Sequence, residues 1–392
     1  MRQRLRLLFP WYRFPPFTDK SIGGLSTTLW DNTNWLSKLG HEVNVLTPGD
    51  REEECTVGNI LVKSSRIGRT IMLGGKLDSE AQRWLSDFDA VISVNNYGAH
   101  SLRSVLGRVH VVRQIHTVAR DRPLTSYLPL KWGILEYAKM GWQKIREQRS
   151  EDALRGVPTV CVSRYLLKKV VEHRVEEEQN TVYIPNGVDT ELFKGSNQEH
   201  TYDLLFVGRF QYAKGLDLLI WALKRLWLKG LRPKLRIVGG FTTKERAHIQ
   251  KIAGDELSKN ISFDGVVTHE LMPGVYRGAG VLVAPSRYET FGLPALEGAA
   301  CCTPVIATNI GGLSEILDYA PHMLVERADH MLFQRKIEEV LTRIDNYKSV
   351  TQAGRVKAES YSIASVAEKF ANYIQNSLQR TTRAPPSEKA AG

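Results

Sequence analysis

Short apolar runs recur along the whole chain, and each is followed by a stretch in which apolar residues return every three or four positions. The short runs are typical of strands buried on both faces, and the longer periodic stretches are typical of amphipathic helices. In the first half the predicted strands are Leu5–Phe9, Glu42–Thr47, Ala90–Val94, Val109–Ile115 and Thr159–Val162. The predicted helices there are Leu25–Leu39 and a long one from about Trp132 to Leu154.

The second half of the chain repeats this pattern. Its predicted strands are Leu204–Val207, Leu235–Val238, Ile261–Phe263, Leu282–Ala284 and Val305–Ala307. Its predicted helices lie near Gly215–Leu228, Lys244–Leu257, Pro294–Cys301 and Asp329–Ile344. Repeated strand–helix units predict parallel sheets covered by helices on both faces. The turn-rich stretch Ile184–Asp189 lies between the two series and predicts a hinge.

A chain of 392 residues holds two domains more often than one. We therefore predict an α/β protein with two doubly wound, Rossmann-like domains. The expected N-terminal domain is residues 1–185, and the expected C-terminal domain is residues 186–360. An amphipathic helix is predicted over residues 361–378, and residues 379–392, with Pro385 and Pro386, are expected to be disordered.

Composition narrows the class of protein. The content of 42% hydrophobic and 24% charged residues is ordinary for a globular protein, and no apolar run is long enough to predict a membrane-spanning helix. The apolar part of residues 1–9 is too short for a signal-peptide core. The four cysteines have no metal-ligand spacing and fit a reducing compartment. We expect a cytoplasmic protein, with peripheral contact at the inner face of the membrane as an open alternative.

The net charge of +11 favours anionic partners. Nucleotides, phosphorylated substrates, a membrane surface and nucleic acid all meet this description. No nucleic-acid motif is present, so we expect no nucleic-acid partner. The charge alone does not choose among the others.

Two acids flank a predicted helix start in the second half. Glu289 precedes the sequence Thr-Phe-Gly-Leu-Pro-Ala-Leu, which ends at Glu297, and apolar strands lie on both sides. This arrangement predicts a loop that enters a helix at the carboxyl edge of a parallel sheet, where ligands bind in open α/β folds. A helix with an acidic first turn explains one of these acids but not both. The pair suits a ligand with hydroxyls at both ends and an anion in the middle, such as a nucleotide-sugar.

Several fragments in a fixed order carry a resemblance to a known family. They are Asn186–Asp189, Gly208–Gly215, Glu289–Glu297, Pro304–Thr308 and Gly311-Gly312. Together they resemble the retaining glycosyltransferases of family 4, which have the GT-B fold. The resemblance implies two domains facing each other across a cleft, with the sugar nucleotide in the C-terminal domain and the acceptor in the N-terminal one. It also implies that the last helix returns to the N-terminal domain.

The resemblance assigns roles to residues of the second half. Arg209 and Lys214, which follow Gly208, would hold the diphosphate without a metal, since a guanidinium and an ammonium both bind phosphate oxygens. Glu289 would bind hydroxyls of the transferred sugar, and Glu297 would accept from the ribose diol. The backbone amides of three residues would approach the donor: Phe291, Gly292 and Leu293. We expect Gly292 to be glycine because a ligand approaches its backbone closely.

The resemblance places three further candidates in the first half. Gly23 and Gly24 precede the first helix and would close on the diphosphate, although such pairs are also common in turns. His116 follows a predicted strand and would lie near the donor sugar, the alternative being an ordinary polar loop residue. We do not expect His116 to be a simple general base. In this family the leaving phosphate is thought to take the acceptor proton.

Two residues near the helix after Glu289 depart from the usual family pattern. Cys302 stands where the family usually has a glycine, which would favour a left-handed helix cap. The cysteine therefore predicts a different helix ending. Gly298 replaces the more usual alanine, at a helix cost of roughly 1 kcal/mol.

The sequence says least about which residues bind the acceptor. Trp11, Tyr12 and Phe14 follow the first strand and could stack on a sugar-like ring, or they could pack onto their own domain. The segment Lys131–Trp142 mixes aromatic and basic residues and could rest on an anionic membrane, the alternative being a core helix with a solvated face.

We therefore predict an enzyme, a retaining hexosyl- or N-acetylhexosaminyltransferase that needs no metal or other cofactor. A UDP-sugar is the favoured donor, and an acceptor hydroxyl on a small molecule such as an aminocyclitol antibiotic precursor fits the pattern. One alternative is a transferase that uses GDP-mannose or a UDP-sugar and acts on a lipid-linked glycan at the membrane surface. Another, from a different class, is a non-catalytic nucleotide-sugar-binding scaffold, which the presence of Arg209, Lys214, Glu289 and Glu297 disfavours.

Overall fold

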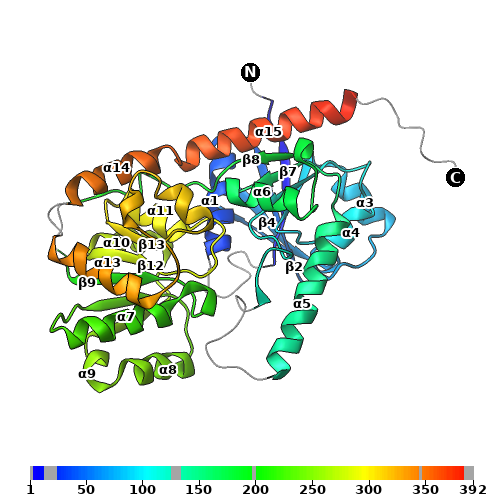
Figure 1. Cartoon of the computed structure of the whole chain (residues 1–392). Helices are drawn as coiled ribbons and strands as arrows, with labels where there is room; N and C mark the ends of the chain where they lie inside the picture. Colours follow the sequence, from blue (N-terminus) through cyan, green and yellow to red (C-terminus); the bar gives the residue numbers. More distant parts are fainter. Residues whose placement is uncertain (1–2, 13–23, 125–133, 197–199, 344–346, 384–392) are drawn as a thin grey trace.

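The computed structural model describes residues 3–12, 24–124, 134–196, 200–343 and 347–383. Two parallel sheets, each with helices packed against it, lie side by side, and the last helix runs from the C-terminal half across to the N-terminal half (Figure 1). Residues Gly23 and Phe14 lie outside the described residues. The predicted α/β class and the two doubly wound sheets are confirmed.

The N-terminal sheet has eight strands in the order β3-β4-β2-β1-β5-β6-β7-β8. Neighbouring strands are parallel except for the antiparallel pair β3 and β4 at one edge. The strands are β1 (Arg6–Pro10), β2 (Glu42–Pro48), β3 (Glu53–Val57), β4 (Ile60–Ser65), β5 (Ala90–Val94), β6 (Val111–Ile115), β7 (Thr159–Cys161) and β8 (Thr181–Tyr183). Strand order reverses between β1 and β5, which makes this point the topological switch of the sheet.

The described residues of this half form six helices, and three of them begin at side-chain caps. They are α1 (Gly24–Lys38), α2 (Arg66–Leu73), α3 (Ser79–Leu85), α4 (Ala99–Arg103), α5 (Ile134–Ala153) and α6 (Arg164–Glu172). Ser65, Asp78 and Ser163 each accept a hydrogen bond from the backbone of the first turn that follows. Such caps satisfy amides that have no partner inside the helix.

The C-terminal sheet has six parallel strands in the order β11-β10-β9-β12-β13-β14, with its switch point between β9 and β12. They are β9 (Tyr202–Val207), β10 (Leu235–Val238), β11 (Ile261–Gly265), β12 (Ala279–Ala284), β13 (Val305–Thr308) and β14 (Leu324–Val325). The helices are α7 (Leu216–Leu228), α8 (Thr243–Ala253), α9 (Asp255–Ser258), α10 (Met272–Arg277), α11 (Leu293–Ala300), α12 (Gly311–Ile316), α13 (His330–Thr342) and α14 (Lys348–Glu359).

The last helix, α15 (Ile363–Arg383), packs on α1 of the N-terminal domain. Its buried residues Phe370 and Ile374 share a core with Leu29 and Leu36 of α1. The return of this helix to the N-terminal domain is therefore confirmed. It is longer than predicted, because residues 379–383 are helical rather than part of a disordered tail.

The chain passes between the two domains twice, near Val188 and near Ser362, and these two segments are hydrogen-bonded to each other. The amide of Val188 donates to the carbonyl of Tyr361, and the amide of Ile363 donates to the carbonyl of Val188, both at 2.9 Å. The predicted hinge at Ile184–Asp189 is thus one half of a two-stranded connection.

Two predictions of local structure are wrong. The helix expected over Lys244–Leu257 is broken into α8 and α9 at Gly254, whose φ of 81° cannot continue a helix. Cys302 does not change the helix ending, because it adopts the left-handed conformation itself, with φ of 58°. The amides of Cys302 and Thr303 donate to the carbonyls of Ala299 and Gly298, which completes the usual left-handed cap of a helix.

Gly298 has a packing role. A Cβ at this position would lie 2.8 Å from Cδ2 of Leu282, so the glycine lets α11 lie close against β12. None of the helices in the described ranges is long and apolar enough to cross a membrane.

Candidate active site

Lys214 and Glu289 meet at the switch point of the C-terminal sheet. Lys214 ends a short 3-10 turn after β9, and Glu289 lies in the loop after β12. The ammonium Nζ of Lys214 donates to Oε2 of Glu289 at 2.6 Å, and both side chains remain partly exposed. Strands β9 and β12 are parallel neighbours, so their following loops emerge at the same edge. Two residues that are far apart in the sequence form one charged pair where α/β sheets bind ligands.

Arg287 fixes the two loops relative to each other. Its Nη1 and Nη2 donate to the two carboxylate oxygens of Asp217 on α7 at 2.7 and 2.6 Å, and Nη1 also donates to the carbonyl of Tyr212. Its guanidinium carbon lies 3.9 Å from the ring centroid of Tyr212, and its amide donates to the carbonyl of Ala213. A bidentate, stacked arginine is more rigid than a single ion pair. Arg287 therefore positions the Lys214–Glu289 pair.

The helix α11 begins directly after this pair. Gly292 has φ of 100°, and a Cβ there would lie 2.6 Å from Cδ2 of Leu313. Gly292 is therefore required by its own backbone conformation and by the packing of Leu313, whereas the expected close approach of a ligand stays a prediction. Phe291 is buried in the C-terminal core, whereas Leu293 is the first residue of α11 and is partly buried.

Glu297 lies deeper than the sequence suggested. Its side chain is only 7% exposed, and the hydroxyl of Tyr276 donates to its Oε2 at 2.5 Å. Burial raises the pKa of Glu297 to about 7, while the hydrogen bond from Tyr276 opposes this rise. In this conformation the carboxyl that was expected to meet a ribose diol has Tyr276 as its partner.

Arg209 faces the N-terminal domain. It is exposed at the end of β9, beside Gly208, and its positive charge opposes the rise that burial causes in the pKa of Tyr97. Tyr97 follows β5 at the switch point of the N-terminal sheet. The switch points of the two sheets are therefore within electrostatic reach of each other.

A second contact joins the domains at α1. Nε2 of His269 lies 3.6 Å from Oδ2 of Asp31, but this is not an ion pair. Burial raises the pKa of Asp31 to about 8, with a further rise from the charge of Glu297, and burial lowers the pKa of His269. Both groups are therefore neutral near pH 7, and Glu297 acts across the domain boundary on α1.

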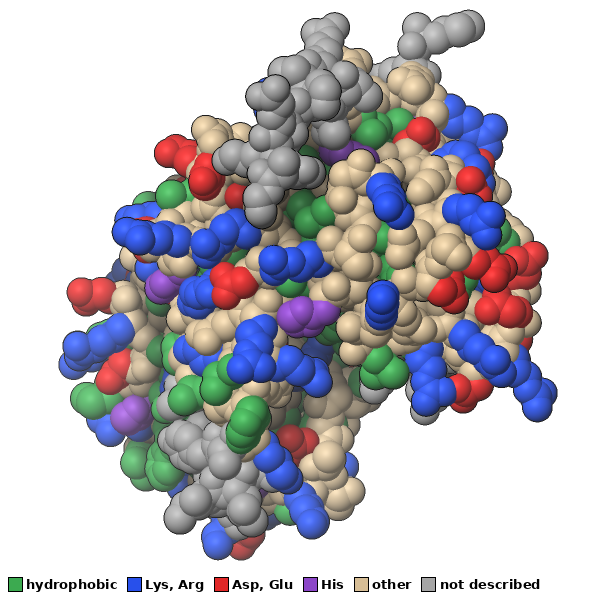
Figure 2. All heavy atoms as spheres, turned by 90° about the vertical axis from the view of Figure 1, so that its right-hand side faces the viewer, with side chains coloured by type: hydrophobic (Ala, Val, Ile, Leu, Met, Phe, Trp, Pro, Cys, Tyr) green, Lys and Arg blue, Asp and Glu red, His purple; other side chains and the backbone are tan. Residues whose placement is uncertain are grey.

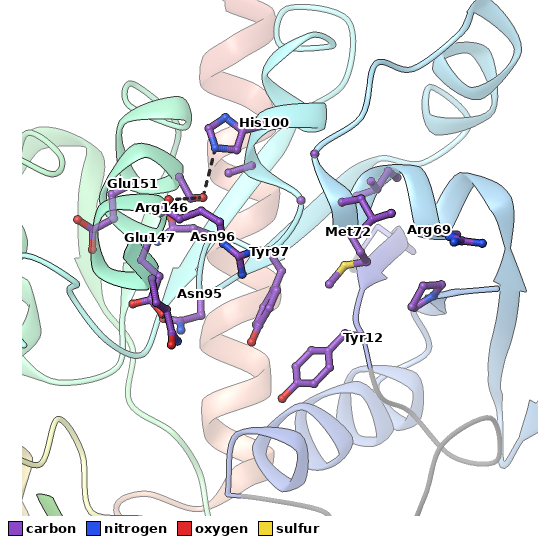
Figure 3. A pocket seen from close by; sticks show the side chains of 18 of the residues that line it. Tyr12, Arg69, Met72, Asn95, Asn96, Tyr97, His100, Arg146, Glu147 and Glu151 are labelled. Atoms are coloured by element: carbon purple, nitrogen blue, oxygen red, sulfur yellow. Dashed lines mark hydrogen bonds between the residues drawn. The ribbon is translucent and has the colours of Figure 1, made fainter. Parts of the chain in front are cut away.

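A cavity of about 680 Å³ opens at the switch point of the N-terminal sheet (Figure 3). The rings of Tyr12 and Tyr97 lie side by side in it, with centroids 5.1 Å apart. Trp11 is fully buried behind them and contacts both rings, so it supports Tyr12 and does not offer a face to a ligand. Of the expected acceptor-binding aromatic residues, Tyr12 lies in this cavity.

Polar groups surround the two tyrosines. Asn95 and Asn96 both have positive φ, 51° and 63°, and Oδ1 of Asn96 is buried without a hydrogen-bond partner. Arg146 and Glu147 of α5 line the opposite side of the cavity (Figure 3). Non-glycine residues rarely adopt this conformation, and strained backbone is common at ligand sites. The sequence reasoning missed this set, although Asn-Asn-Tyr-Gly after a buried strand is a turn signal at the ligand edge.

His116 follows β6 but does not line the cavity. Its side chain is buried, and burial lowers its pKa to about 3, so the imidazole is neutral at any physiological pH. Its amide and that of the following Thr117 donate to Oδ1 of Asn95, which ties this turn to the cavity wall. Gly24 is the first residue of α1.

Two family models together match most of the chain. The model of glycosyltransferase family 4 matches residues 22–192, and that of the glycosyl transferases group 1 matches residues 187–357. An uncharacterized glycosyltransferase of Methanocaldococcus jannaschii is 35% identical over 340 residues, which cover 79% of this chain and 81% of that protein. The chain belongs to glycosyltransferase family 4. Enzymes of this retaining family transfer a sugar from a nucleotide-sugar.

Other curated family members match over shorter segments. A D-inositol 3-phosphate glycosyltransferase of Geodermatophilus obscurus is 34% identical over 195 residues, which cover 45% of this chain and 43% of that protein. A second glycosyltransferase of M. jannaschii is 33% identical over 210 residues, or 52% of this chain and 55% of that protein. The chain thus spans about half the length of these relatives, and their substrates do not by themselves define its own.

Solved structures of glycosyltransferases share the fold. Sucrose-phosphate synthase from Thermosynechococcus elongatus aligns with a TM-score of 0.76 at 18% identity, over 96% of this chain and 100% of that chain. Anabaena HepE in complex with UDP-glucose aligns with a TM-score of 0.69 at 14% identity, over 95% of this chain and 100% of that chain. At such identities the likeness establishes the GT-B fold alone.

The burial of Glu297 generates a prediction on stability and pH. Its pKa is about 7 in the folded protein against an ordinary 4.5, so the native state binds this proton more tightly than the unfolded chain. The stabilisation that comes from this proton is fully present below pH 4.5 and is lost as the pH rises through 7. Glu297→Gln removes this loss. The unfolding free energy of the variant minus that of wild type should therefore be about 2–3 kcal/mol higher at pH 8 than at pH 5.

Urea unfolding at the two pH values, followed by tryptophan fluorescence, measures this difference. Tyr276→Phe is the matched control, because it removes the hydrogen bond that opposes the rise in the pKa of Glu297. That variant should lose stability more steeply than wild type over the same range. A Glu297→Gln effect of equal size at both pH values would contradict a pKa of about 7 for this carboxyl in the folded protein.

Proposed function

We propose that this chain moves a hexose or N-acetylhexosamine from a UDP-sugar to a hydroxyl of an acceptor bound in the N-terminal cavity, without a metal ion. The donor lies at the switch point of the C-terminal sheet, against Lys214 and Glu289. The acceptor lies against Tyr12 and Tyr97. Transfer retains the configuration at the anomeric carbon, as in the family.

The observation that carries the proposal is the contact between Lys214 and Glu289. In a nucleotide-sugar, the hydroxyls of the sugar are hydrogen-bond donors that lie next to an anionic phosphate. The carboxylate oxygen of Glu289, 2.6 Å from the ammonium nitrogen of Lys214, offers an acceptor for a sugar hydroxyl directly beside a cation for the phosphate. The pair is thus complementary to the bond that breaks, the one between the anomeric carbon and the phosphate.

Charge on the leaving diphosphate must be stabilised as the bond breaks. Lys214 and Arg209 follow the same strand, and the charge of Arg209 reaches Tyr97 of the N-terminal cavity. Loss of one such stabilising group typically costs about 3–4 kcal/mol of the barrier. In the proposed mechanism these two cations take the role that a metal has in other transferases. His116 is neutral, so it contributes hydrogen bonding and no charge.

A hydroxylated ring suits the acceptor cavity. Two tyrosine rings offer stacking surfaces, and Asn96, Arg146 and Glu147 offer hydrogen-bonding groups around them. The D-inositol 3-phosphate glycosyltransferase of G. obscurus is named for a cyclitol acceptor, which supports an acceptor of this shape. Anabaena HepE was solved with UDP and with UDP-glucose, which supports a uridine nucleotide in the donor site.

Product analysis tests the proposal directly. The purified chain should be incubated with UDP-glucose, UDP-N-acetylglucosamine and GDP-mannose, each with a panel of cyclitol and sugar acceptors, and the products identified by mass spectrometry. We expect transfer from a UDP-sugar that persists in excess EDTA. Transfer from GDP-mannose alone would overturn the choice of nucleotide. Loss of transfer in EDTA with recovery on adding magnesium or manganese would overturn the role given to Arg209 and Lys214.

Lys214→Ala should leave the protein folded and lower turnover by about 10²-fold or more, because it removes a cation from the leaving phosphate. The chain offers a matched control in Lys229, whose Nζ donates to Glu338 at the same 2.6 Å far from the switch point. Lys229→Ala should keep turnover near that of wild type. Initial rates with saturating donor measure both variants, and near-normal turnover of Lys214→Ala would remove it from the phosphate site.

Glu289 and Glu297 are predicted to act on different parts of the donor. Glu297→Gln should weaken the binding of UDP and of the UDP-sugar alike, because the ribose is present in both. Glu289→Gln should leave the affinity for UDP nearly unchanged and depress turnover with the intact donor, because the sugar is absent from UDP. Calorimetry with the two ligands measures this split. Equal losses of UDP affinity in both variants would contradict the sugar-binding role of Glu289.

A further inference from the structure

Helix α5 presents apolar side chains to solvent on the face that points away from its domain. Trp142 is 72% exposed and Ile145 is 44% exposed, while Met140 and Glu151 on the opposite side of the helix are buried. Trp142 and Ile145 are three residues apart, so they lie on one face of the helix. A large aromatic side chain with this exposure contributes nothing to the core.

Basic residues surround Trp142 on this face. Lys139, Arg146 and Arg149 are exposed and lie three, four and seven residues from Trp142, the spacings that bring side chains together on a helix. The one acid between Lys139 and Arg149 is Glu147, which lies on the flank and accepts from Arg122 at 2.6 Å. Figure 2 looks at the side of the molecule where α5 lies, and blue Lys and Arg side chains occur there beside green hydrophobic ones.

We propose that this face of α5, formed by Lys139, Trp142, Ile145, Arg146 and Arg149, binds the surface of an anionic lipid membrane. Tryptophan and long basic side chains are the residues that hold an amphipathic helix in the headgroup region, the ring at the boundary and the cations on lipid phosphates. The net charge of +11 adds a general attraction to such a surface. The membrane is bound from one side, in agreement with the absence of a spanning helix from the described ranges.

A second copy of the chain does not fit this face as well. In a symmetric dimer the same patch meets itself, so the cations around one Trp142 would face the cations around the other. Like charges brought together in this way cost free energy. A sheet of lipid phosphates supplies the opposite charge together with an apolar layer beneath it.

The face adjoins the N-terminal cavity. Gln143, Arg146 and Ser150, on the neighbouring flank of α5, line that cavity, and Arg146 belongs to both. If the proposed function holds, an acceptor carried in the membrane could reach the cavity without leaving the surface. This consequence rests on the proposed function, whereas the binding of α5 to lipid does not.

Vesicle sedimentation tests the proposal without donor or acceptor. The full chain should be mixed with vesicles of phosphatidylcholine alone and of phosphatidylcholine with about one third phosphatidylglycerol, at low salt and at high salt. We expect sedimentation with the anionic vesicles, little with the neutral ones, and a marked loss at high salt, because salt screens the contacts between cations and phosphates. Failure to bind the anionic vesicles above the neutral level at low salt would overturn the proposal.

The variant Trp142→Gln/Arg149→Gln should bind anionic vesicles at least tenfold more weakly than wild type. One cation near such a surface accounts for about fivefold, and the tryptophan adds to this. The matched control is Trp221→Gln/Arg225→Gln on α7. Like the test variant, it removes one exposed tryptophan and one exposed arginine of the same helix. The control should bind within about twofold of wild type. Equal losses in the two variants would show that net charge alone drives binding and would overturn the role of α5.

Both double variants change exposed side chains, so melting temperatures close to that of wild type are expected and serve as the check on folding. Should Trp142→Gln/Arg149→Gln fail this check, Lys139→Gln/Arg149→Gln replaces it with the same expected loss. Light scattering without vesicles measures the oligomeric state, and so tests whether this face binds a second copy of the chain instead. A wild-type dimer that becomes a monomer on substitution of Trp142 would assign this face to a second copy and overturn the membrane proposal.

Discussion

The donor edge of the C-terminal sheet depends on backbone packed directly on backbone. A Cβ at Gly311 would lie 1.9 Å from the carbonyl oxygen of Glu289, and one at Gly312 would lie 2.4 Å from Cα of Phe291. The first turn of α12 can therefore lie against the loop after β12 only because these residues have no side chain. That contact holds Glu289 in place from one side, and Arg287 and Asp217 hold Lys214 from the other. The charged pair is thus a product of packing, since Glu289 lies in a loop and Lys214 only ends a single 3-10 turn.

Both sheets place polar residues by the same rule of topology. In each sheet the first strand lies at the centre, between the second strand and the fourth of the parallel strands. The loops that follow the first and fourth strands carry the candidate site residues. The C-terminal sheet puts Lys214 and Glu289 there, and the N-terminal sheet puts Tyr12 and Tyr97 there. The contrast lies in burial. Glu289 stays partly exposed beside a cation, whereas Glu297 is buried with a neutral tyrosine, and burial raises the pKa of Glu297 to about 7.

Much of this could be read from the sequence, because buried parallel strands are continuous apolar runs. The ten strands predicted from such runs are all present. Four strands were not predicted: β3, β4, β8 and β14. Strands β3 and β8 have no buried residue, β4 ends in the polar run Lys63-Ser-Ser, and β14 has only two residues. Motif residues after strands, such as Lys214 and Glu289, were expected at one edge, and the structure brings them into contact.

What the sequence could not show were contacts between distant residues and individual backbone angles. Tyr276 lies on another helix, and no spacing rule links it to Glu297. Cys302 was expected to alter a helix end, yet its neighbours' hydrogen bonds hold it in a conformation that glycine adopts more easily. The cavity beside Tyr97 likewise depends on the positive φ of Asn95 and Asn96. The Asn-Asn-Tyr-Gly sequence signals a turn there, but it does not show that a cavity forms beside it.

The paired crossings between the domains have a mechanical consequence. Val188 is hydrogen-bonded to the residues on both sides of Ser362, and a Cβ at Gly187 would lie 2.5 Å from Cα of Ile363, so the two segments form a narrow ribbon. The segments are joined by one isolated bridge with two hydrogen bonds, so sliding one segment along the other would break both bonds. Because α15 is packed on α1, one end of this ribbon is clamped to the N-terminal domain. The two passages of the chain between the domains are therefore pinned together at one point, so the domains cannot move apart there without breaking these hydrogen bonds.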